Sequence, residues 1–144
     1  IFGFTIFNDY TARDAQLVEG SGNLGPAKGK DFDGANVLGP CIVTADEIAD
    51  VYNLQMRAWV NGVLKTDGST KSMKWDFADM IAHLSQSETI YPGEVIGSGT
   101  VGDGCGFERM EFLADGDLVE LEIQGIGRTA NKIVAPHIKA GSVL

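Results

Sequence analysis

The stretch that decides the fold is Leu54–Thr66, which reads LQMRAWVNGVLKT. Two apolar runs, Leu54–Val60 and Val63–Thr66, flank the dipeptide Asn61-Gly62. Asn-Gly is the strongest short signal for a β-hairpin, because a type I′ turn needs a positive φ at both central residues. The stretch therefore predicts two antiparallel strands joined by a tight turn.

Short apolar runs of the same kind recur along the chain. In Leu118–Gln124, apolar Val119, Leu121 and Ile123 alternate with polar residues, which is the pattern of a half-buried strand. Four further strands are predicted, at Ile1–Phe7, Cys41–Thr44, Glu94–Ser98 and Thr129–Val134. Nineteen glycines punctuate these runs and long helical periodicity is rare, so we expect a β-rich α+β fold.

Two helices are expected. Thr11–Asp14 resembles a capping box and is predicted to open a helix of about two turns. Asp76–Ser85 places apolar side chains on one helical face: Phe77, Met80, Ile81 and Leu84. Val18–Gly39 is rich in glycine and is predicted to be irregular. Loops of that length are usually functional or mobile.

The charge balance limits what the chain can bind. Its 144 residues include 20 acidic and 11 basic side chains, for a formal charge of −9. Such a field repels phosphate backbones and anionic lipid, so we expect no nucleic-acid partner and no membrane partner. A small anionic substrate stays compatible, because a local cation reverses the field inside a pocket. Cys41 and Cys105 form no CxxC motif and indicate a reduced, cytoplasmic protein.

The chain opens at Ile1 inside a predicted core strand. Domains seldom begin in this way. We therefore expect residues 1–144 to form a single domain that is an incomplete catalytic domain lacking its N-terminal segment.

Two polar clusters are candidate sites. Asn8–Gln16 lies at a strand-to-helix junction, where the Asp9 carboxylate is held rigidly and Arg13 and Gln16 are one helical turn apart. Spacing alone leaves helix capping as an equal alternative. Lys28–Gly34 places lysine beside glycine in a long loop, as suits stabilisation of an oxyanion. Taken alone, that segment is more often a solvated charge run.

A third candidate is the glycine-rich Gly97–Gly106. It contains the pattern GxGxxG, but no helix follows at once and no βαβ unit surrounds it, so we expect no dinucleotide site. A backbone bend around a ligand, with the Thr100 hydroxyl and free amides as donors, fits better.

Two further features are weaker candidates. Glu120 and Glu122 have metal-ligand spacing, although their alternation with apolar residues favours a solvent-facing side of a strand. His83 and His137 have no Ser, Cys or acidic partner in a motif. A Ser-His-Asp hydrolase is therefore not expected.

Motifs in collinear order cover nearly the whole chain: Gly3–Gln16 (GFTIFNDYTARDAQ), Gly29–Asp33 (GKDFD), Leu38–Pro40, Val60–Gly62, Tyr91–Thr100 (YPGEVIGSGT), Asp115–Asp117 and Glu122–Gly127. Together they resemble the fumarylacetoacetate hydrolase family. The resemblance implies a mixed β-sandwich roll with few short helices. It also implies a metal-dependent homodimeric enzyme that hydrolyses a C–C bond in a small keto acid of the β-diketo or acylpyruvate type.

The resemblance assigns roles to individual residues. Asp9 matches the metal-ligand aspartate of the motif NDxxARD, with Mg²⁺ (or Mn²⁺ or Ca²⁺) as the ion. Lys30 matches the active-site lysine, and Glu108 matches an acidic residue that orients the catalytic histidine in some members. Three residues match positions that contact substrate: Arg13, Gln16 and Thr100.

Part of the family's site has no counterpart in the sequence. The Glu-x-Glu metal pair and the catalytic histidine lie upstream of NDxxARD in the family, so Glu120 and Glu122 do not inherit that role. Hydrolysis therefore rests on the resemblance alone. Isomerisation, decarboxylation or hydration at the same metal, or a catalytically incomplete binding module, stay open as alternatives.

Overall fold

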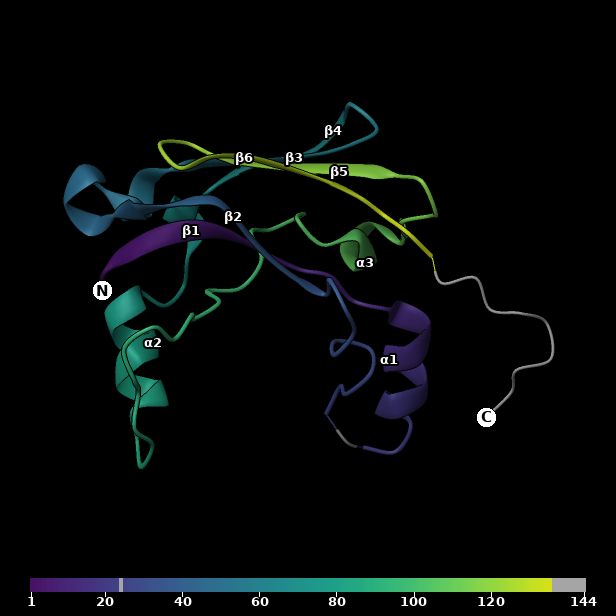
Figure 1. Ribbon diagram of the computed structural model, residues 1–144, viewed down its shortest axis with the longest axis horizontal. Helices are drawn as coiled ribbons and strands as arrows, with labels where there is room; N and C mark the ends of the chain where they lie inside the picture. The colour runs from purple at the N-terminus through teal and green to yellow at the C-terminus, as the bar shows by residue number, and fades with distance from the viewer. Residues whose placement is uncertain (24, 136–144) are drawn as a thin grey trace.

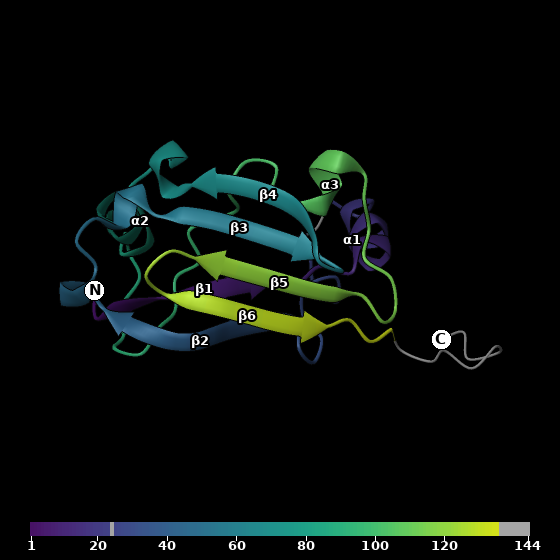
Figure 2. The ribbon, with the colours of Figure 1, turned by 90° about the horizontal axis from the view of Figure 1, so that it is seen from above.

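The computed structural model describes residues 1–23 and 25–135 as two packed antiparallel sheets (Figure 1). A two-stranded sheet is made of β1 (Gly3–Asp9) and β2 (Asn36–Thr44). The other sheet has four strands in the order β4 (Val63–Ser69), β3 (Gln55–Val60), β5 (Leu118–Ile123) and β6 (Gly127–Lys132). Figure 2 shows the two-stranded sheet lying beneath the four-stranded one, next to β5 and β6. The β-rich α+β class expected from the sequence is confirmed.

The short helices lie outside the sheets. Helices α1 (Arg13–Gly20) and α2 (Phe77–Leu84) project from the two ends of the β1–β2 layer, away from the four-stranded sheet (Figure 1). The single turn α3 (Gly106–Arg109) lies between the sheets and α1. No helix within the described residues is both long enough and apolar enough to cross a bilayer.

The core sits where the two sheets meet. Ile6 of β1, 2% exposed, packs with Leu54 and Ile126. Leu121 and Ile123 of β5 pack against this cluster, as the alternation in their strand predicts. Burial of these side chains fixes the register of β1 and β5, because a slip by one residue would turn them out to solvent.

The opposite side of β5 carries the two glutamates. Glu120 forms an ion pair of 3.0 Å with Arg128, whose guanidinium stacks 4.1 Å from the ring centroid of Trp59. Glu122 forms longer ion pairs with Arg57 and Arg128. Both carboxylates therefore serve charge pairing on an outer sheet face, as the strand alternation favours.

The predicted hairpin forms between β3 and β4. Asn61 has φ 52° and Gly62 has φ 76°, as a type I′ turn requires. The Asn61 amide also donates to Asp117 Oδ1 at 2.8 Å and accepts from the Leu118 amide at 2.9 Å. One side chain thus fastens the hairpin to the turn that precedes β5.

Two sequence-based predictions are wrong. Glu94–Ser98 forms no strand, because it pairs with no strand of the described residues; Gly97 lies against the Phe7 ring of β1 instead. The capping box at Thr11–Asp14 is absent. The N-cap is Ala12, whose amide donates to Gly29 O at 2.9 Å, so a distant loop takes the place of a local cap.

One other difference concerns a boundary, and one concerns an additional element. The strand expected at Cys41–Thr44 starts at Asn36, because Asn36–Gly39 pairs with the end of β1. Helix α2 forms as expected, with Asp76 in a capping box. α3 was not predicted, because four residues show no periodicity. His137 lies outside the described residues.

Gly62→Ala tests the hairpin turn. A Cβ at this position meets no atom within 4 Å, so the cost comes from the left-handed backbone and should be about 1 kcal/mol of unfolding free energy. Gly20→Ala at the end of α1 is the control: its Cβ also meets nothing and its φ is not positive. It should leave stability unchanged or slightly raised. Equal losses of unfolding free energy in the two variants, measured by urea denaturation, would contradict the turn assignment.

Candidate functional site

The site begins at the last residue of β1. Asp9 ends the β1–β2 ladder opposite Asn36, so its backbone is fixed while its side chain stays 41% exposed. The Lys30 ammonium forms an ion pair with Asp9 Oδ2. Two residues assigned to the site by separate motifs thus lie in direct contact.

A close backbone approach brings Lys30 to this position. A Cβ on Gly29 would lie 2.9 Å from the backbone nitrogen of Gln16, so only glycine fits without a backbone shift. The carbonyl of Gly29 accepts a hydrogen bond from the Ala12 amide. The loop before Lys30 is therefore in contact with the first turn of α1.

A glutamate of α1 holds the same loop from its other side. The Glu19 carboxylate accepts hydrogen bonds from the amides of Ala27 (2.8 Å), Lys28 (2.6 Å) and Gly29 (3.2 Å). The bond from Ala27, with those from Gly29 and Lys28, holds the pKa of Glu19 below its ordinary value. Sequence analysis missed Glu19, because no local pattern links it to amides eight to ten residues away.

Arg13 projects from the first turn of α1 toward the glycine-rich loop. Its Nη1 donates to Gln16 Oε1 at 2.6 Å, and its Nη2 donates to Cys105 Sγ at 3.1 Å. Its guanidinium carbon lies 5.5 Å from the ring centroid of Phe107. The structure therefore confirms that Arg13 and Gln16 share one face, and it adds two partners from α3 and its N-cap.

Glu108 lies in the same turn. Its Oε2 accepts a hydrogen bond from the Cys105 amide at 3.0 Å and closes a capping box over α3. This contact gives Glu108 a structural role in the described residues. Its predicted role in orienting a histidine stays a prediction.

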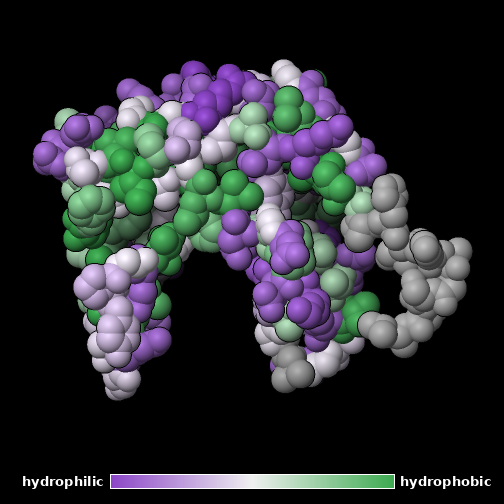
Figure 3. All heavy atoms as spheres, viewed as in Figure 1, coloured by the Kyte–Doolittle hydropathy of each residue, from purple (hydrophilic) through white to green (hydrophobic). Residues whose placement is uncertain are grey.

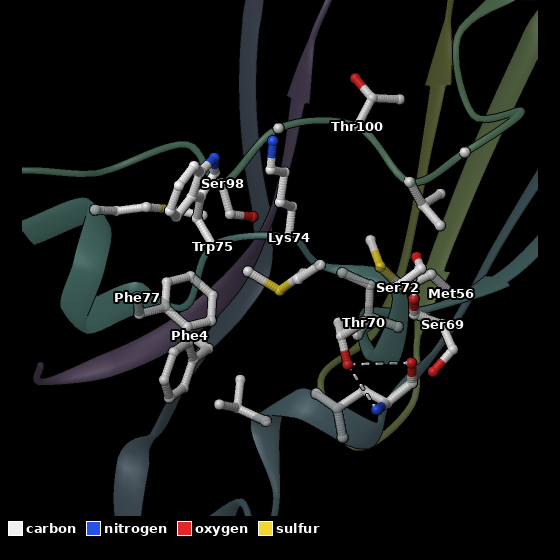
Figure 4. A pocket seen from close by; sticks show the side chains of 18 of the residues that line it. Phe4, Met56, Ser69, Thr70, Ser72, Lys74, Trp75, Phe77, Ser98 and Thr100 are labelled. Atoms are coloured by element: carbon white, nitrogen blue, oxygen red, sulfur yellow. Dashed lines mark hydrogen bonds between the residues drawn. The ribbon is translucent and has the colours of Figure 1, made fainter.

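Thr100 lies at the other end of the glycine-rich loop. It lines a cavity of about 340 Å³ together with Lys74 and Ser98. Figure 4 shows Phe4, Trp75 and Phe77 on one side of this cavity, and Lys74 beside Ser98. In Figure 3 hydrophobic side chains gather in the hollow between α1 and α2.

The glycine-rich loop links the cavity to the charged cluster. Asp9 and Lys30 do not line the cavity, and neither do Arg13 and Gln16, so Thr100 is not brought together with them. Cys105, five residues after Thr100, contacts Arg13. The helix that follows the loop is the single turn α3, which has no extended N-terminus for a pyrophosphate.

Asp9 fits a divalent metal ion as one ligand. A partly exposed carboxylate at a rigid strand end supplies the hard oxygen that Mg²⁺, Mn²⁺ and Ca²⁺ prefer. The described residues hold no group of three His, Cys, Asp or Glu side chains placed to bind a metal. Asp9 thus accounts for one part of such a site.

Comparison with known proteins decides the family. The family described as fumarylacetoacetate (FAA) hydrolase C-terminal matches residues 1–134. The chain belongs to the fumarylacetoacetate hydrolase family. Its fold matches a fumarylacetoacetate hydrolase from Exiguobacterium antarcticum with a TM-score of 0.80, at 36% identity over 94% of this chain and 47% of that one.

Other family members show a range of named activities. The mitochondrial oxaloacetate tautomerase of Rattus norvegicus is 40% identical over 136 residues, which cover 93% of this chain and 42% of the tautomerase. A maleylpyruvate hydrolase from Sphingobium, solved with manganese(II) and pyruvate, has a TM-score of 0.73 and 30% identity over 92% of this chain and 44% of that one. This chain therefore spans less than half the length of these relatives.

Glu19→Gln tests the contact that holds the Lys30 loop. The neutral amide is a weaker acceptor, so hydrogen exchange at the amides of residues 27–29 should speed up at pH 7 in the complete protein. Asp14→Asn removes a charge from the same helix without touching the loop and should leave these amides unchanged.

The same contact has a defined pH dependence. Because the pKa of Glu19 is lowered in the folded protein, its stabilising contribution is present above the pKa of an unfolded glutamate. It is lost as the pH falls through the lowered value. Amide protection in the wild type should therefore disappear on acidification, and protection that is identical in Glu19→Gln at every pH would contradict this role.

Proposed function

We propose that the complete protein containing this chain is a divalent-metal-dependent enzyme that tautomerises a small keto dicarboxylic acid of the oxaloacetate type. The observation that carries the proposal is the contact between Asp9 and Lys30, with the Arg13–Gln16 pair on the adjoining helix. The rat relative at 40% identity, an oxaloacetate tautomerase, supports this choice of substrate.

The described residues supply positive charge where such a reaction develops negative charge. Removing a proton from the carbon between two carbonyls leaves an enolate, whose oxygen carries the charge. The Lys30 ammonium, positioned beside Asp9, stabilises this oxygen electrostatically. A bound divalent ion, with Asp9 among its ligands, supplies Lewis-acid polarisation of the carbonyl groups.

Arg13 and Gln16 serve binding and orientation. The guanidinium of Arg13 presents parallel N–H donors that match a substrate carboxylate, and Gln16 orients it through a 2.6 Å hydrogen bond. Thr100 lines the separate cavity, so its contact with substrate rests on the family resemblance and not on its place beside Arg13. In the keto-to-enol direction one proton leaves the carbon and one is added to the enolate oxygen, and the reverse direction undoes both steps, so the reaction is a net isomerisation.

Hydrolysis of a C–C bond in an acylpyruvate-type acid is the second candidate. It is favoured by the similarity to the Sphingobium maleylpyruvate hydrolase at 30% identity. The same Lys30 charge would stabilise the enolate that leaves when the bond breaks. The two candidates differ in whether water attacks a carbonyl carbon, which the charges of Asp9 and Lys30 do not decide.

We further propose a homodimer, on the basis of the family resemblance. Light scattering of the complete protein gives its mass and tests this directly. The cytoplasmic location expected from the cysteines stays a prediction, because the rat relative is mitochondrial.

A substrate panel separates the candidates. The complete protein with Mg²⁺ or Mn²⁺ should accelerate keto–enol exchange of oxaloacetate, followed by ultraviolet absorbance, without releasing a second product. Release of pyruvate from an acylpyruvate, identified by mass, would favour hydrolysis instead. Turnover of neither class would overturn the proposed function.

Lys30→Ala tests the electrostatic role in the complete protein. If Lys30 stabilises charge that develops only in the transition state, kcat and kcat/KM should fall together by about 10²–10³-fold. Lys28→Ala is the matched control, since Lys28 is 80% exposed and its ion pair within the described residues is with Asp31 of the same loop. It should change the rate by no more than about threefold, the order of a surface ion pair. Equal effects of the two variants would remove Lys30 from the mechanism.

Asp9→Asn tests the metal ligand without using activity. One anionic ligand becomes neutral, so the rise in melting temperature caused by Mg²⁺ or Mn²⁺ in the complete protein should be reduced or lost. Glu122→Gln, on the outer sheet face, should keep the full rise. If the metal-induced rise in melting temperature is kept in Asp9→Asn but lost in Glu122→Gln, the metal site lies on β5 instead.

A further inference from the structure

We propose that the turn α3 is a positioning device for Arg13, in which Phe107 and Cys105 hold the guanidinium in the orientation that binds the substrate carboxylate. The inference rests on the proposed function, because it concerns how the same site recognises its substrate. It gives the end of the glycine-rich loop a role that the sequence motifs do not assign.

The first observation is the set of contacts around one guanidinium. Gln16 Oε1 accepts from Nη1, Cys105 Sγ accepts from Nη2, and the guanidinium carbon lies over the ring of Phe107, 5.5 Å from its centroid. A flexible arginine has a large rotamer entropy, and these three contacts restrict it to few orientations. The guanidinium is therefore ordered by this protein's own side chains.

The second observation is that several contacts hold α3 in place. Glu108 caps it through the Cys105 amide, and the Phe112 ring packs edge-on to Phe107 with centroids 6.4 Å apart. Arg109 donates to the carbonyl of Asp103. A turn of four residues has little stability of its own, so these contacts give Phe107 and Cys105 fixed places.

A third contact ties the turn to the sheet. Lys65 of β4 forms a hydrogen-bonded ion pair of 2.9 Å with Glu111, just after α3. That bond and the charge of Lys65 lower the pKa of Glu111. Arg13 is thus linked through α3 to the four-stranded sheet, although Arg13 and Cys105 are 92 residues apart in the chain.

Phe107→Leu tests whether α3 positions Arg13. Phe107 is 44% exposed, so its truncation leaves no sealed cavity and the protein should still fold. Loss of the cation–π contact should raise KM for oxaloacetate about 2- to 5-fold with kcat nearly unchanged. Phe107→Tyr keeps an aromatic face and should restore the wild-type KM.

Two comparisons separate positioning from a general structural role. With the mono-ester of oxaloacetate that lacks the bound carboxylate, Phe107→Leu should leave KM unchanged. In an Arg13→Gln background, Phe107→Leu should have no further effect on KM for the diacid, because the group that it positions is gone. Equal rises for acid and ester, or additive effects of the two substitutions, would overturn the proposal.

Variants of Cys105 provide an independent second test. Cys105→Ala removes the sulfur acceptor and should raise KM for the diacid, whereas Cys105→Ser keeps an acceptor and an N-cap and should restore it. Cys41→Ala, at the other cysteine, is the control and should behave as wild type. If the wild type turns over neither substrate class, the proposed function is overturned. If the wild type is active and KM is unchanged in all Phe107 and Cys105 variants, only the positioning role of α3 is overturned.

Discussion

The packing of Ile6 between the two sheets is the constraint on which the rest of the structure depends. Ile6 is 2% exposed and lies against Leu54 and Ile126, so β1 cannot slide or rotate without opening the core. Asp9 follows three residues later at the end of the same strand. The carboxylate that pairs with the Lys30 ammonium thus takes its position from a buried isoleucine.

The charge of Lys30 is placed by the loop between α1 and β2. Polar contacts hold the part of that loop before Lys30: the Glu19 carboxylate accepts hydrogen bonds from three backbone amides, and the Gly29 carbonyl accepts one from the Ala12 amide. Buried or half-buried backbone amides and carbonyls need hydrogen-bond partners, and each partner also fixes the orientation of the loop backbone. The chain thereby holds Lys30 against Asp9 without a rigid element of its own.

Sequence analysis was successful where the relevant contacts are local. Asn61-Gly62 predicted its turn, because the required dihedral angles depend on those two residues alone. The alternation in β5 identified its buried face, and the spacing of Arg13 and Gln16 placed them together. The family motifs added Lys30, whose contact with Asp9 spans 21 residues and leaves no periodic signal.

The failures have a common physical origin in long-range contacts. Glu94–Ser98 has the composition of a strand, but strand formation needs a neighbour with free hydrogen-bonding groups, and within the described residues no strand pairs with this segment. Thr11 is a good capping residue, but the Ala12 amide is satisfied by Gly29 from a distant loop. Neither the Glu19 contacts nor the Arg13–Cys105 contact follows from any pattern within a single segment.

The arrangement also explains why one family carries several named reactions. Tautomerisation, decarboxylation and C–C hydrolysis of keto acids all pass through an enolate, so a cation fixed beside a carboxylate serves each of them equally. In the proposed mechanism, Lys30 and Asp9 provide this shared part from the loop before β2 and from the end of β1. The products differ according to which group delivers a proton or a water molecule, and to how the substrate carboxylate is turned toward it. In the proposed site, selectivity would therefore depend on the contacts of α3 and its N-cap with Arg13, while the electrostatic stabilisation would be common to all of these reactions.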